Sequence, residues 1–324
     1  MTWPITYRDV LDAEKRIRRY LPPTPLRNYP PIDNYTNAKV WVKHENHHPT
    51  NAFKVRNGLA SLTGLGFESI KNGVVAATSG NHGLGVAWAA RKLGVTATIC
   101  VANGTNPEKV DAIRMFGARV IEQGNDYDQA VQVMEQLSTE HGYVAIHSTN
   151  NPFASAGAGT MTLEIIRDLD ARQETLDAMV IAIGGGSQAV GAMTVLRELK
   201  RDIPVFGVQA AGAPTLSQAW KAKTPLSGKT PVTIAEGIAT RETYEVTFGA
   251  LCEGLTDFIT VSEKEIRDAM RFMIQATHNL VEPAGAVGVA GVCRLRCQLQ
   301  GKTVAVILSG GNVDLQTLYE VIKP

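Results

Sequence analysis

Short apolar runs alternate with longer segments of helical periodicity along most of the chain. The apolar runs, rich in Val, Ile and Ala, predict strands at residues 40–43, 74–77, 96–101, 119–122, 178–183, 205–209, 258–261 and 303–308. The segments between them predict helices at residues 83–92, 107–115, 127–141, 189–200, 263–279 and 284–299. Strands that alternate with helices are typical of an α/β fold with parallel sheets. In such folds, ligands bind in the loops that follow the carboxyl ends of the strands.

The strands fall into two groups along the sequence. Residues 74–143 predict a compact unit of about four strands, and a second, larger set begins near Met179. The small residues of segment 153–159 favour a crossover between the two units. Segment 210–234 is polar and rich in Gly and Pro, so we expect a loop with one short helix there.

Composition excludes several classes of protein. The chain has 324 residues, 44% of them hydrophobic and 19% charged, which is ordinary for a globular protein of two domains or one large one. A net charge of +1 gives no basic surface for nucleic acid or an anionic membrane. No apolar stretch has the length of a membrane helix, and the N-terminus lacks the pattern of a signal peptide.

Cysteine and histidine residues give no strong metal pattern. Cys293 and Cys297 are four apart on a predicted helix and could share a face, but without nearby His or Cys partners they are interpreted as ordinary core or surface residues. Cysteine spacing of this kind fits a reducing cytoplasm. His44, His47 and His48 cluster in a segment that we interpret as a polar loop rather than a ligand set.

The loop after strand 74–77 contains Ser79, Gly80, Asn81 and His82 and opens a predicted helix. Backbone amides at a helix N-terminus can hold an anionic group such as a carboxylate. The alternative is a helix cap with glycine turns, which accounts for one polar residue but not for the whole cluster.

Two more strand-end loops carry unusual residues. Gly184, Gly185, Gly186 and Ser187 follow strand 178–183, and consecutive glycines let backbone N–H groups converge on a phosphate. The pattern is neither a P-loop nor a dinucleotide fingerprint, and a flexible hinge is the alternative. Ser309 follows strand 303–308 and places a hydroxyl at the end of a sheet strand, unless the Ser-Gly-Gly-Asn segment is only a turn.

Lys54 lies between the strand at 40–43 and a helical pattern, directly after Phe53. A lysine amine can form a Schiff base with a carbonyl compound when its surroundings favour the neutral form. By itself, the segment is more typical of a solvated surface lysine. The three anion-binding or hydroxyl-bearing loops favour the chemical role.

Together these segments resemble the fold-type II pyridoxal-phosphate (PLP) enzymes, within the serine/threonine dehydratase and serine racemase branch. The resemblance extends over nearly the whole chain, through segments 24–26, 49–58, 79–83, 157–160, 184–187, 235–237, 282–283 and 309–312. It implies an α/β fold of two open, mostly parallel twisted sheets flanked by helices. It also implies a large PLP-binding domain of residues 1–65 and 148–324, with a small domain of residues 66–147 inserted in it.

The resemblance assigns roles to individual residues. Lys54 corresponds to the Schiff-base lysine, and Ser79 to the serine on the opposite side of the substrate α-carbon. The cofactor-binding positions are Phe53, Lys54, Asn81, Gly184, Gly185, Gly186, Ser187, Gly237, Glu282 and Ser309. The substrate-binding positions are Ser79, Gly80, Asn81 and His82.

The chain departs from the family pattern at several positions. Asn57 stands where Gly is common, and Ser187 stands at the fourth position of a loop that often has four glycines. Some members bind a divalent cation through acidic residues, but the matching positions here are Gln209 and Thr215, so no metal is expected.

The resemblance implies a dehydratase (ammonia-lyase) that converts a β-hydroxy amino acid such as L-threonine or L-serine to a 2-oxo acid and ammonia. An amino-acid racemase and a 3-hydroxyaspartate dehydratase are alternatives on the same scaffold. Arg241 could bind a second carboxylate in the latter, or it faces solvent, which we favour. A β-replacement synthase and a non-catalytic PLP-binding protein are further alternatives. Related enzymes are commonly dimers or tetramers, and we expect a homodimer.

Overall fold

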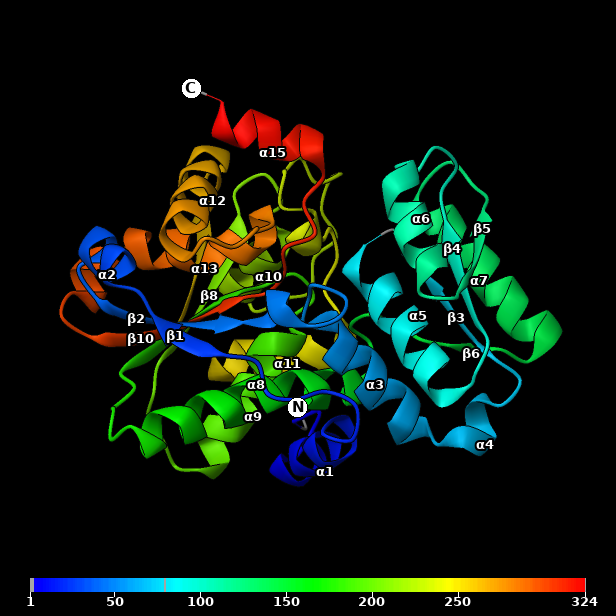
Figure 1. The fold of residues 1–324 in the computed structure, drawn as a ribbon, viewed down its shortest axis with the longest axis horizontal. Coiled ribbons are helices and arrows are strands. Elements are labelled where there is room, and N and C mark those ends of the chain that lie inside the picture. The colour runs from blue at the N-terminus through cyan, green and yellow to red at the C-terminus, as the bar shows by residue number, and fades with distance from the viewer. Residues whose placement is uncertain (1–2, 79, 324) are drawn as a thin grey trace.

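The computed structural model of the protein describes residues 3–78 and 80–323. Its strands form two separate sheets, one of six strands and one of four, with helices packed around each (Figure 1). The α/β fold with two mostly parallel sheets is confirmed. The boundaries of the two predicted domains stay a prediction.

The larger sheet has the strand order β1-β2-β10-β7-β8-β9, and all its neighbours are parallel except the pair β1 and β2. Its strands are β1 (Leu26–Asn28), β2 (Lys39–His44), β7 (Ala178–Ala182), β8 (Val205–Ala210), β9 (Asp257–Val261) and β10 (Thr303–Leu308). The smaller sheet is parallel, with the order β5-β4-β3-β6. It consists of β3 (Val74–Ala77), β4 (Ala97–Val101), β5 (Arg119–Glu122) and β6 (Val144–Ala145).

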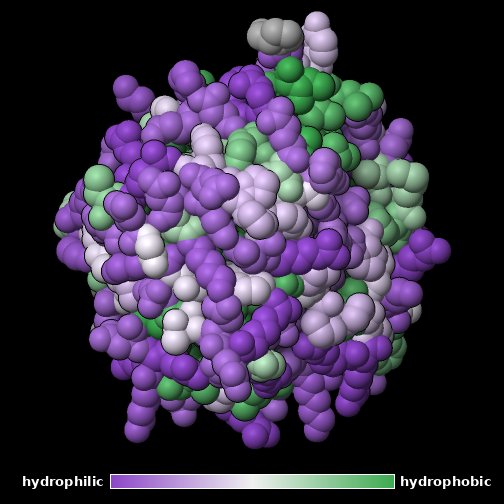
Figure 2. All heavy atoms as spheres, turned by 60° about the vertical axis from the view of Figure 1, so that its left-hand side comes forward, coloured by the Kyte–Doolittle hydropathy of each residue, from purple (hydrophilic) through white to green (hydrophobic). Residues whose placement is uncertain are grey.

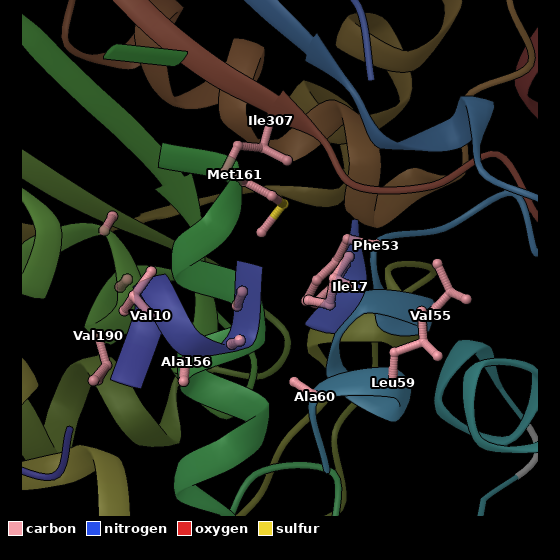
Figure 3. Packing of buried hydrophobic residues seen from close by; sticks show 14 of the residues in the cluster. Val10, Ile17, Phe53, Val55, Leu59, Ala60, Ala156, Met161, Val190 and Ile307 are labelled. Carbon is pink, nitrogen blue, oxygen red and sulfur yellow. The ribbon is translucent and has the colours of Figure 1, made fainter. Parts of the chain in front are cut away.

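Helices cover both faces of the larger sheet. Successive strand residues point to opposite faces, and both faces are apolar and need to be buried. Met179 and Ile181 of β7 face the cluster that includes α1, α8 and α9, whereas Val180 faces the cluster that includes α2, α12 and α13. These helices are α1 (Tyr7–Ile17), α2 (Pro30–Thr36), α8 (Pro152–Ala171), α9 (Ser187–Glu198), α12 (Glu263–Thr277) and α13 (Pro283–Arg294). Figure 3 shows the first cluster, where Val10, Met161, Val190 and Ile307 pack together with residues of α3.

The remaining helices surround the smaller sheet or connect the layers. They are α3 (Lys54–Leu65), α4 (Phe67–Ile70), α5 (Asn81–Leu93), α6 (Pro107–Met115), α7 (Tyr127–His141), α10 (Thr215–Ala222), α11 (Glu245–Gly254), α14 (Arg296–Leu299), α15 (Leu315–Ile322) and the 3₁₀ turns η1 (Glu45–His47) and η2 (Glu236–Ile238). Helix α3 links the two sheets, since it packs against both α8 and α5.

The strands predicted from sequence are present, with ends that differ by one residue at most, and the predicted helices are present with ends within two residues. Helix α10 also confirms the short helix expected in segment 210–234. The predicted helix 284–299 is divided at Leu295, where the backbone leaves the helical region and the side chain is buried in the core. Cys293 and Cys297 therefore lie on different helices, α13 and α14.

The crossover expected at segment 153–159 is present and helical, because these residues belong to the 20-residue helix α8, which connects β6 of the smaller sheet to β7 of the larger one. The small residues there allow helices to approach closely. A Cβ on Gly157 would lie 2.7 Å from the Arg56 carbonyl oxygen of α3, and one on Gly159 would lie 3.2 Å from the Gly191 carbonyl oxygen of α9. Close helix packing explains the small residues of this segment.

The surface is mostly hydrophilic, and one face carries an apolar patch beside the C-terminal end of α15 (Figure 2). Leu315, Tyr319 and Ile322 of this helix are exposed. No helix in residues 3–78 and 80–323 is long and apolar enough to cross a membrane.

Candidate active site

A cavity of about 540 Å³ lies where loops from both sheets meet. Its wall includes every residue that the sequence assigned to the site except Ser79, which lies outside the described residues. The assigned residues in the wall are Phe53, Lys54, Gly80, Asn81, His82, Gly184, Gly185, Gly186, Ser187, Gly237, Glu282 and Ser309. Segments more than 250 positions apart in sequence therefore share one cavity.

The pairing of β2 with β10 brings Lys54 and Ser309 together. The strands are parallel, with Leu308 opposite His44, so their carboxyl ends lie side by side. The two backbone segments that follow these strands remain paired. The Phe53 N–H donates to the Ser309 carbonyl at 2.9 Å, and Ala52 forms a bridge with Gly310. This pairing holds the start of α3 at the edge of the cavity.

Lys54 is the first residue of α3, and its amine lies in a setting that favours the neutral form. Burial lowers the pKa of Lys54 from 10.5 to about 8. Its Nζ lies 5.2 Å from the centre of the Phe53 ring and 3.5 Å from the Ser148 carbonyl oxygen. No carboxylate among the described residues forms a salt bridge with it. Roughly a tenth of the amine is therefore neutral at pH 7, far more than for an ordinary lysine.

The glycine loop between β7 and α9 exposes backbone donors to the cavity. Its carbonyl groups are engaged elsewhere: Thr240 Oγ1 donates to the Gly184 oxygen at 3.4 Å, and Thr247 Oγ1 donates to the Gly185 oxygen at 2.6 Å. The N–H groups of residues 184 to 189 form no backbone hydrogen bond with any other described residue. Unpaired amides at the start of a helix form an anion site.

Side chains in place of these glycines would collide with neighbouring residues. A Cβ on Gly185 would lie 2.0 Å from Thr149 Oγ1, and one on Gly184 would lie 2.9 Å from the Gly237 carbonyl oxygen. Gly186 has φ of +100°, which favours glycine. The loop conformation thus depends on glycine at all of these positions.

Asn81, Glu282 and Asn312 form a hydrogen-bonded polar group in the cavity wall. Asn81 Nδ2 lies 2.9 Å from both Glu282 carboxyl oxygens, and Asn312 Nδ2 donates to Asn81 Oδ1 at 2.7 Å. Burial raises the pKa of Glu282 to about 7, although hydrogen bonds from Asn81 and the Asn312 backbone oppose the change. Glu282 can therefore hold a proton near neutral pH.

Helix α5 begins at Asn81 and points its N-terminus at the cavity. The N–H groups of Asn81 and His82 donate to no other described residue. His82 Nε2 lies 2.8 Å from the Ile146 carbonyl oxygen, so this nitrogen carries the proton. Burial, together with Lys54, lowers the pKa of His82 to about 3, and the ring is neutral.

Two ion pairs beside the cavity connect helices of the smaller sheet to the segment between β8 and β9. Lys109 of α6 pairs with Glu236 of η2, and Asp128 of α7 pairs with Arg241. Arg241 is not part of the cavity wall, whereas Lys109 is. The arrangement therefore gives no support to Arg241 as the residue that binds a substrate carboxylate. Arg241 is paired with Asp128 rather than simply facing solvent, as we favoured.

Gln209 and Thr215 are both buried, and Gln209 braces a loop. Gln209 Oε1 accepts from the Ser217 N–H at 3.0 Å, and its Nε2 lies 3.4 Å from Thr240 Oγ1. Within residues 3–78 and 80–323, no group of three or more His, Cys, Asp or Glu side chains could hold a metal ion.

A buried charge cluster lies behind the start of α3, and sequence reasoning missed it. Arg56 binds Glu45 with Nε at 2.7 Å and Nη2 at 2.9 Å, and it binds Glu164 with Nη1 at 2.7 Å and Nη2 at 2.9 Å. Lys43 Nζ lies 2.6 Å from Glu164, and His48 Nε2 lies 3.0 Å from Glu45. Burial alone would raise the pKa of Glu45, but Arg56 and His48 hold it well below its usual range.

The same cluster corrects the interpretation of the histidines as polar loop residues. His48 is buried beside Glu45, and His44 is the buried last residue of β2. Burial, with His47 nearby, lowers the pKa of His44 to about 4. Only His47, in η1, contacts a loop residue at the surface, Asn279.

The cavity and its loops can be compared with known proteins. A family model described as "Pyridoxal-phosphate dependent enzyme" matches residues 17–310. The chain belongs to this family. It is accordingly a PLP enzyme, as the resemblance implied.

Relatives in this family divide between closely related activities. The chain is 32% identical to an L-threonine ammonia-lyase of Thermotoga maritima over 98% of its own length and 78% of that protein. It is 33% identical to an L-threo-3-hydroxyaspartate ammonia-lyase of Saccharomyces cerevisiae over 98% of its length and 96% of that protein. The structure of maize serine racemase superimposes with a TM-score of 0.93 at 27% identity, covering 98% of this chain and 97% of the other.

The cavity fits PLP by its own chemistry. The glycine loop offers a cradle of unpaired amides for the phosphate, in which Gly185 leaves no room for a side chain. Lys54 offers an amine for the aldehyde, and the Phe53 ring lies beside it. Ser309 and Asn81 offer neutral polar groups to the ring substituents.

Asn312, Ser148 and Lys109 also line the cavity and were not assigned to the site from sequence. Asn312 could have been found, since it ends the Ser-Gly-Gly-Asn loop after the last strand. No sequence motif marks Ser148 and Lys109 as site residues, because they reach the cavity only through the packing of the smaller sheet.

Proposed function

We propose that the protein is an ammonia-lyase that converts a β-hydroxy amino acid, of the L-threonine or L-serine type, to a 2-oxo acid and ammonia. The observation that carries the proposal is the Lys54 amine, which is partly neutral and lines the same cavity as the glycine loop and Ser309. When bound, PLP supplies the electron sink that makes the substrate α-proton acidic.

The N-terminus of α5 binds the substrate carboxylate in this proposal. The N–H groups of Asn81 and His82 are available for it, and the neutral His82 ring adds no competing charge. The space beside Gly80 is open, since a Cβ there would have nothing within 4 Å, so a carboxylate can enter. The carboxylate is then oriented so that the α-proton faces Lys54.

Lys54 acts as the general base that removes the α-proton. Its lowered pKa makes the neutral amine available without requiring an alkaline medium. The β-hydroxyl then leaves with a proton as water, which completes the elimination, and one water hydrolyses the enamine product to the 2-oxo acid and ammonia. Ser79, proposed by resemblance for the opposite side of the α-carbon, lies outside the described residues.

Ser309 favours elimination over transamination. A hydroxyl gives the ring nitrogen of the cofactor a neutral partner, whereas an aspartate would hold that nitrogen protonated. Glu282 is buried and, with a pKa of about 7, can be uncharged near this ring. The resulting electron sink is weak, which disfavours a long-lived carbanion.

A second candidate substrate is L-threo-3-hydroxyaspartate. It is favoured by the relative from Saccharomyces cerevisiae, which aligns with this chain over nearly the full length of both. Of the described residues in the cavity wall, Lys109 is the cation that remains for a second carboxylate once Lys54 is assigned to the cofactor. An amino-acid racemase is the remaining alternative, by similarity to maize serine racemase.

The test is a panel of L- and D-serine, L- and D-threonine and L-threo-3-hydroxyaspartate, assayed for 2-oxo acid, ammonia and enantiomer. The proposal expects stoichiometric 2-oxo acid and ammonia from at least one L-hydroxy amino acid. Inversion of configuration without ammonia would support the racemase instead. If no compound releases ammonia, the ammonia-lyase proposal is contradicted.

We also propose that the protein is a homodimer of the cytoplasm. All four cysteines are free, which fits a reducing compartment. The homodimer rests on resemblance alone, and light scattering after gel filtration tests it through the molar mass. A mass near 35 kDa, that of one chain of 34.9 kDa, would contradict it.

A further inference from the structure

We propose that Asn57 is a positioning residue for the cofactor phosphate, acting through the hydroxyl of Ser187. The inference rests on the proposed function, in which the glycine loop binds that phosphate. Asn57 does not touch the phosphate in this proposal. It determines which way the single proton of Ser187 points.

The two side chains meet at the back of the glycine loop. Asn57 lies in the first turn of α3 and is fully buried, and Ser187 is the first residue of α9 and is 5% exposed. Asn57 Nδ2 lies 3.4 Å from Ser187 Oγ. This contact links the helix that carries Lys54 to the helix that opens at the phosphate loop.

Donor and acceptor numbers decide the direction of the Ser187 proton. A serine hydroxyl has one proton and two lone pairs, and an amide NH₂ group can only donate. When Asn57 Nδ2 donates to Ser187, the hydroxyl proton is free to point into the cavity. A phosphate dianion has only acceptor oxygens, so this is the orientation that binds it.

The alternative orientation of the amide would weaken the site. Rotating the Asn57 amide would bring Oδ1 to Ser187, which would take the hydroxyl proton and leave a lone pair facing the phosphate. Oδ1 has no hydrogen-bond partner among the described residues, so no other contact there favours either orientation. The Asn57 amide is therefore free to donate to Ser187, and in that orientation it keeps the hydroxyl proton directed at the phosphate.

The pair also explains two departures of this sequence from the family pattern. Asn57 and Ser187 each stand where glycine is common, and the fold places them against each other. Ser187 alone would leave its hydroxyl free to turn away from the phosphate. Asn57 alone would be a buried amide with no partner at either end, which is costly.

The experiment measures cofactor affinity rather than activity. Apoprotein is titrated with PLP and, in parallel, with pyridoxal, which lacks the phosphate, and binding is followed by absorbance. The variants are Asn57→Ala, Ser187→Ala and the double variant. Ser61→Ala is the matched control, because it removes a buried hydroxyl one turn further along α3 that donates to the Asn57 carbonyl, accepts from Asn151 Nδ2 and does not bond the glycine loop.

Ser187→Ala is expected to weaken PLP binding about tenfold, since it removes a hydrogen bond to a charged group. Asn57→Ala is expected to weaken it about threefold or more, and the double variant no further than Ser187→Ala alone, because both act on one hydrogen bond. Pyridoxal affinity should stay within about twofold throughout. If Asn57→Ala unfolds the protein, Asn57→Ser replaces it, since its shorter side chain does not reach Ser187.

Unchanged PLP affinity in the folded Asn57 variant would overturn the inference, as would an equal loss for pyridoxal or losses that add in the double variant. These outcomes differ from failure of the proposed function. In that case, wild-type apoprotein would not distinguish PLP from pyridoxal, or the loaded protein would release no ammonia.

Discussion

At the scale of single residues, the lowered pKa of Lys54 has a measurable consequence. An amine must be neutral to attack the aldehyde of PLP, and burial lowers the pKa of Lys54 from 10.5 to about 8. The rate at which apoprotein captures PLP should therefore rise with pH up to about 8 and then level off. Stopped-flow absorbance measures this rate, and a rise that continues toward pH 10.5 would contradict the setting described for Lys54.

Glu282 makes folding stability depend on pH. Burial raises its pKa from 4.5 to about 7, so between these values the folded apoprotein binds more protons than the unfolded chain. Stability from this group is present below pH 4.5 and is lost as the pH rises through 7. Glu282→Gln should remove this contribution, which is at most about 3 kcal/mol. Urea denaturation of both proteins across this range measures the difference, and parallel curves would contradict the prediction.

The sequence identifies site residues well where a local pattern carries the chemistry. Lys54 after Phe53, the three glycines before Ser187 and the Ser309 loop are each visible as short motifs. Lys109 and Ser148 were missed because they reach the cavity only through the packing of the smaller sheet. Arg56 was missed as well, since a buried arginine is recognised only when its partners Glu45 and Glu164, far apart in sequence, are placed around it.

At the scale of elements, the charge cluster around Arg56 fixes α3 against α8 and the end of β2. Arg56→Met should cost about 3–5 kcal/mol of unfolding free energy, because it leaves two buried carboxylates without their main partner. Urea denaturation measures the loss. Arg8→Ala is the control, since Arg8 forms an exposed pair with Asp12 that is worth less than about 1 kcal/mol. Equal effects of the two substitutions would contradict the importance of the cluster.

Helices α3 and α5 touch through glycines, and this contact holds the two sides of the site together. A Cβ on Gly85 would lie 2.4 Å from the Lys54 carbonyl oxygen, so Gly85→Ala should force α5 away from α3. Ammonia release should fall by tenfold or more, because misplacement of about 1 Å is costly at a reacting centre. The exposed substitution Arg91→Ala on the same helix is the control. Full activity of Gly85→Ala would show that the helices can separate without consequence.

The elements themselves were mostly predictable, and the exceptions have physical causes. Helix α8 was not among the predicted helices because Gly157 and Gly159, which normally disfavour helix, are required where α3 and α9 approach. The two-residue strand β6 and the three-residue strand β1 are too short to show a hydrophobic period.

At the scale of the whole molecule, Lys109–Glu236 and Asp128–Arg241 join helices α6 and α7 to the segment between β8 and β9, beside the cavity. Exposed ion pairs contribute little to folding, so the double variant Glu236→Gln with Asp128→Asn should change the unfolding free energy by less than about 1 kcal/mol. The double variant should raise the KM for the amino acid about two- to fivefold if the ion pairs hold the cavity closed over the substrate. High salt should raise the KM of the wild type in the same way and leave that of the double variant unchanged. A salt effect of equal size in both proteins would contradict this role.

The central claim is that Lys54 is the covalent anchor of PLP and the base of the elimination. The most direct test is borohydride reduction of the PLP-loaded protein followed by peptide mass spectrometry, together with ammonia release by Lys54→Ala and by Lys92→Ala as a control. We predict that the cofactor mass is found on Lys54, that Lys54→Ala releases no ammonia from any hydroxy amino acid, and that Lys92→Ala is fully active. Cofactor mass on another lysine, or ammonia release by Lys54→Ala at the wild-type rate, would contradict the account.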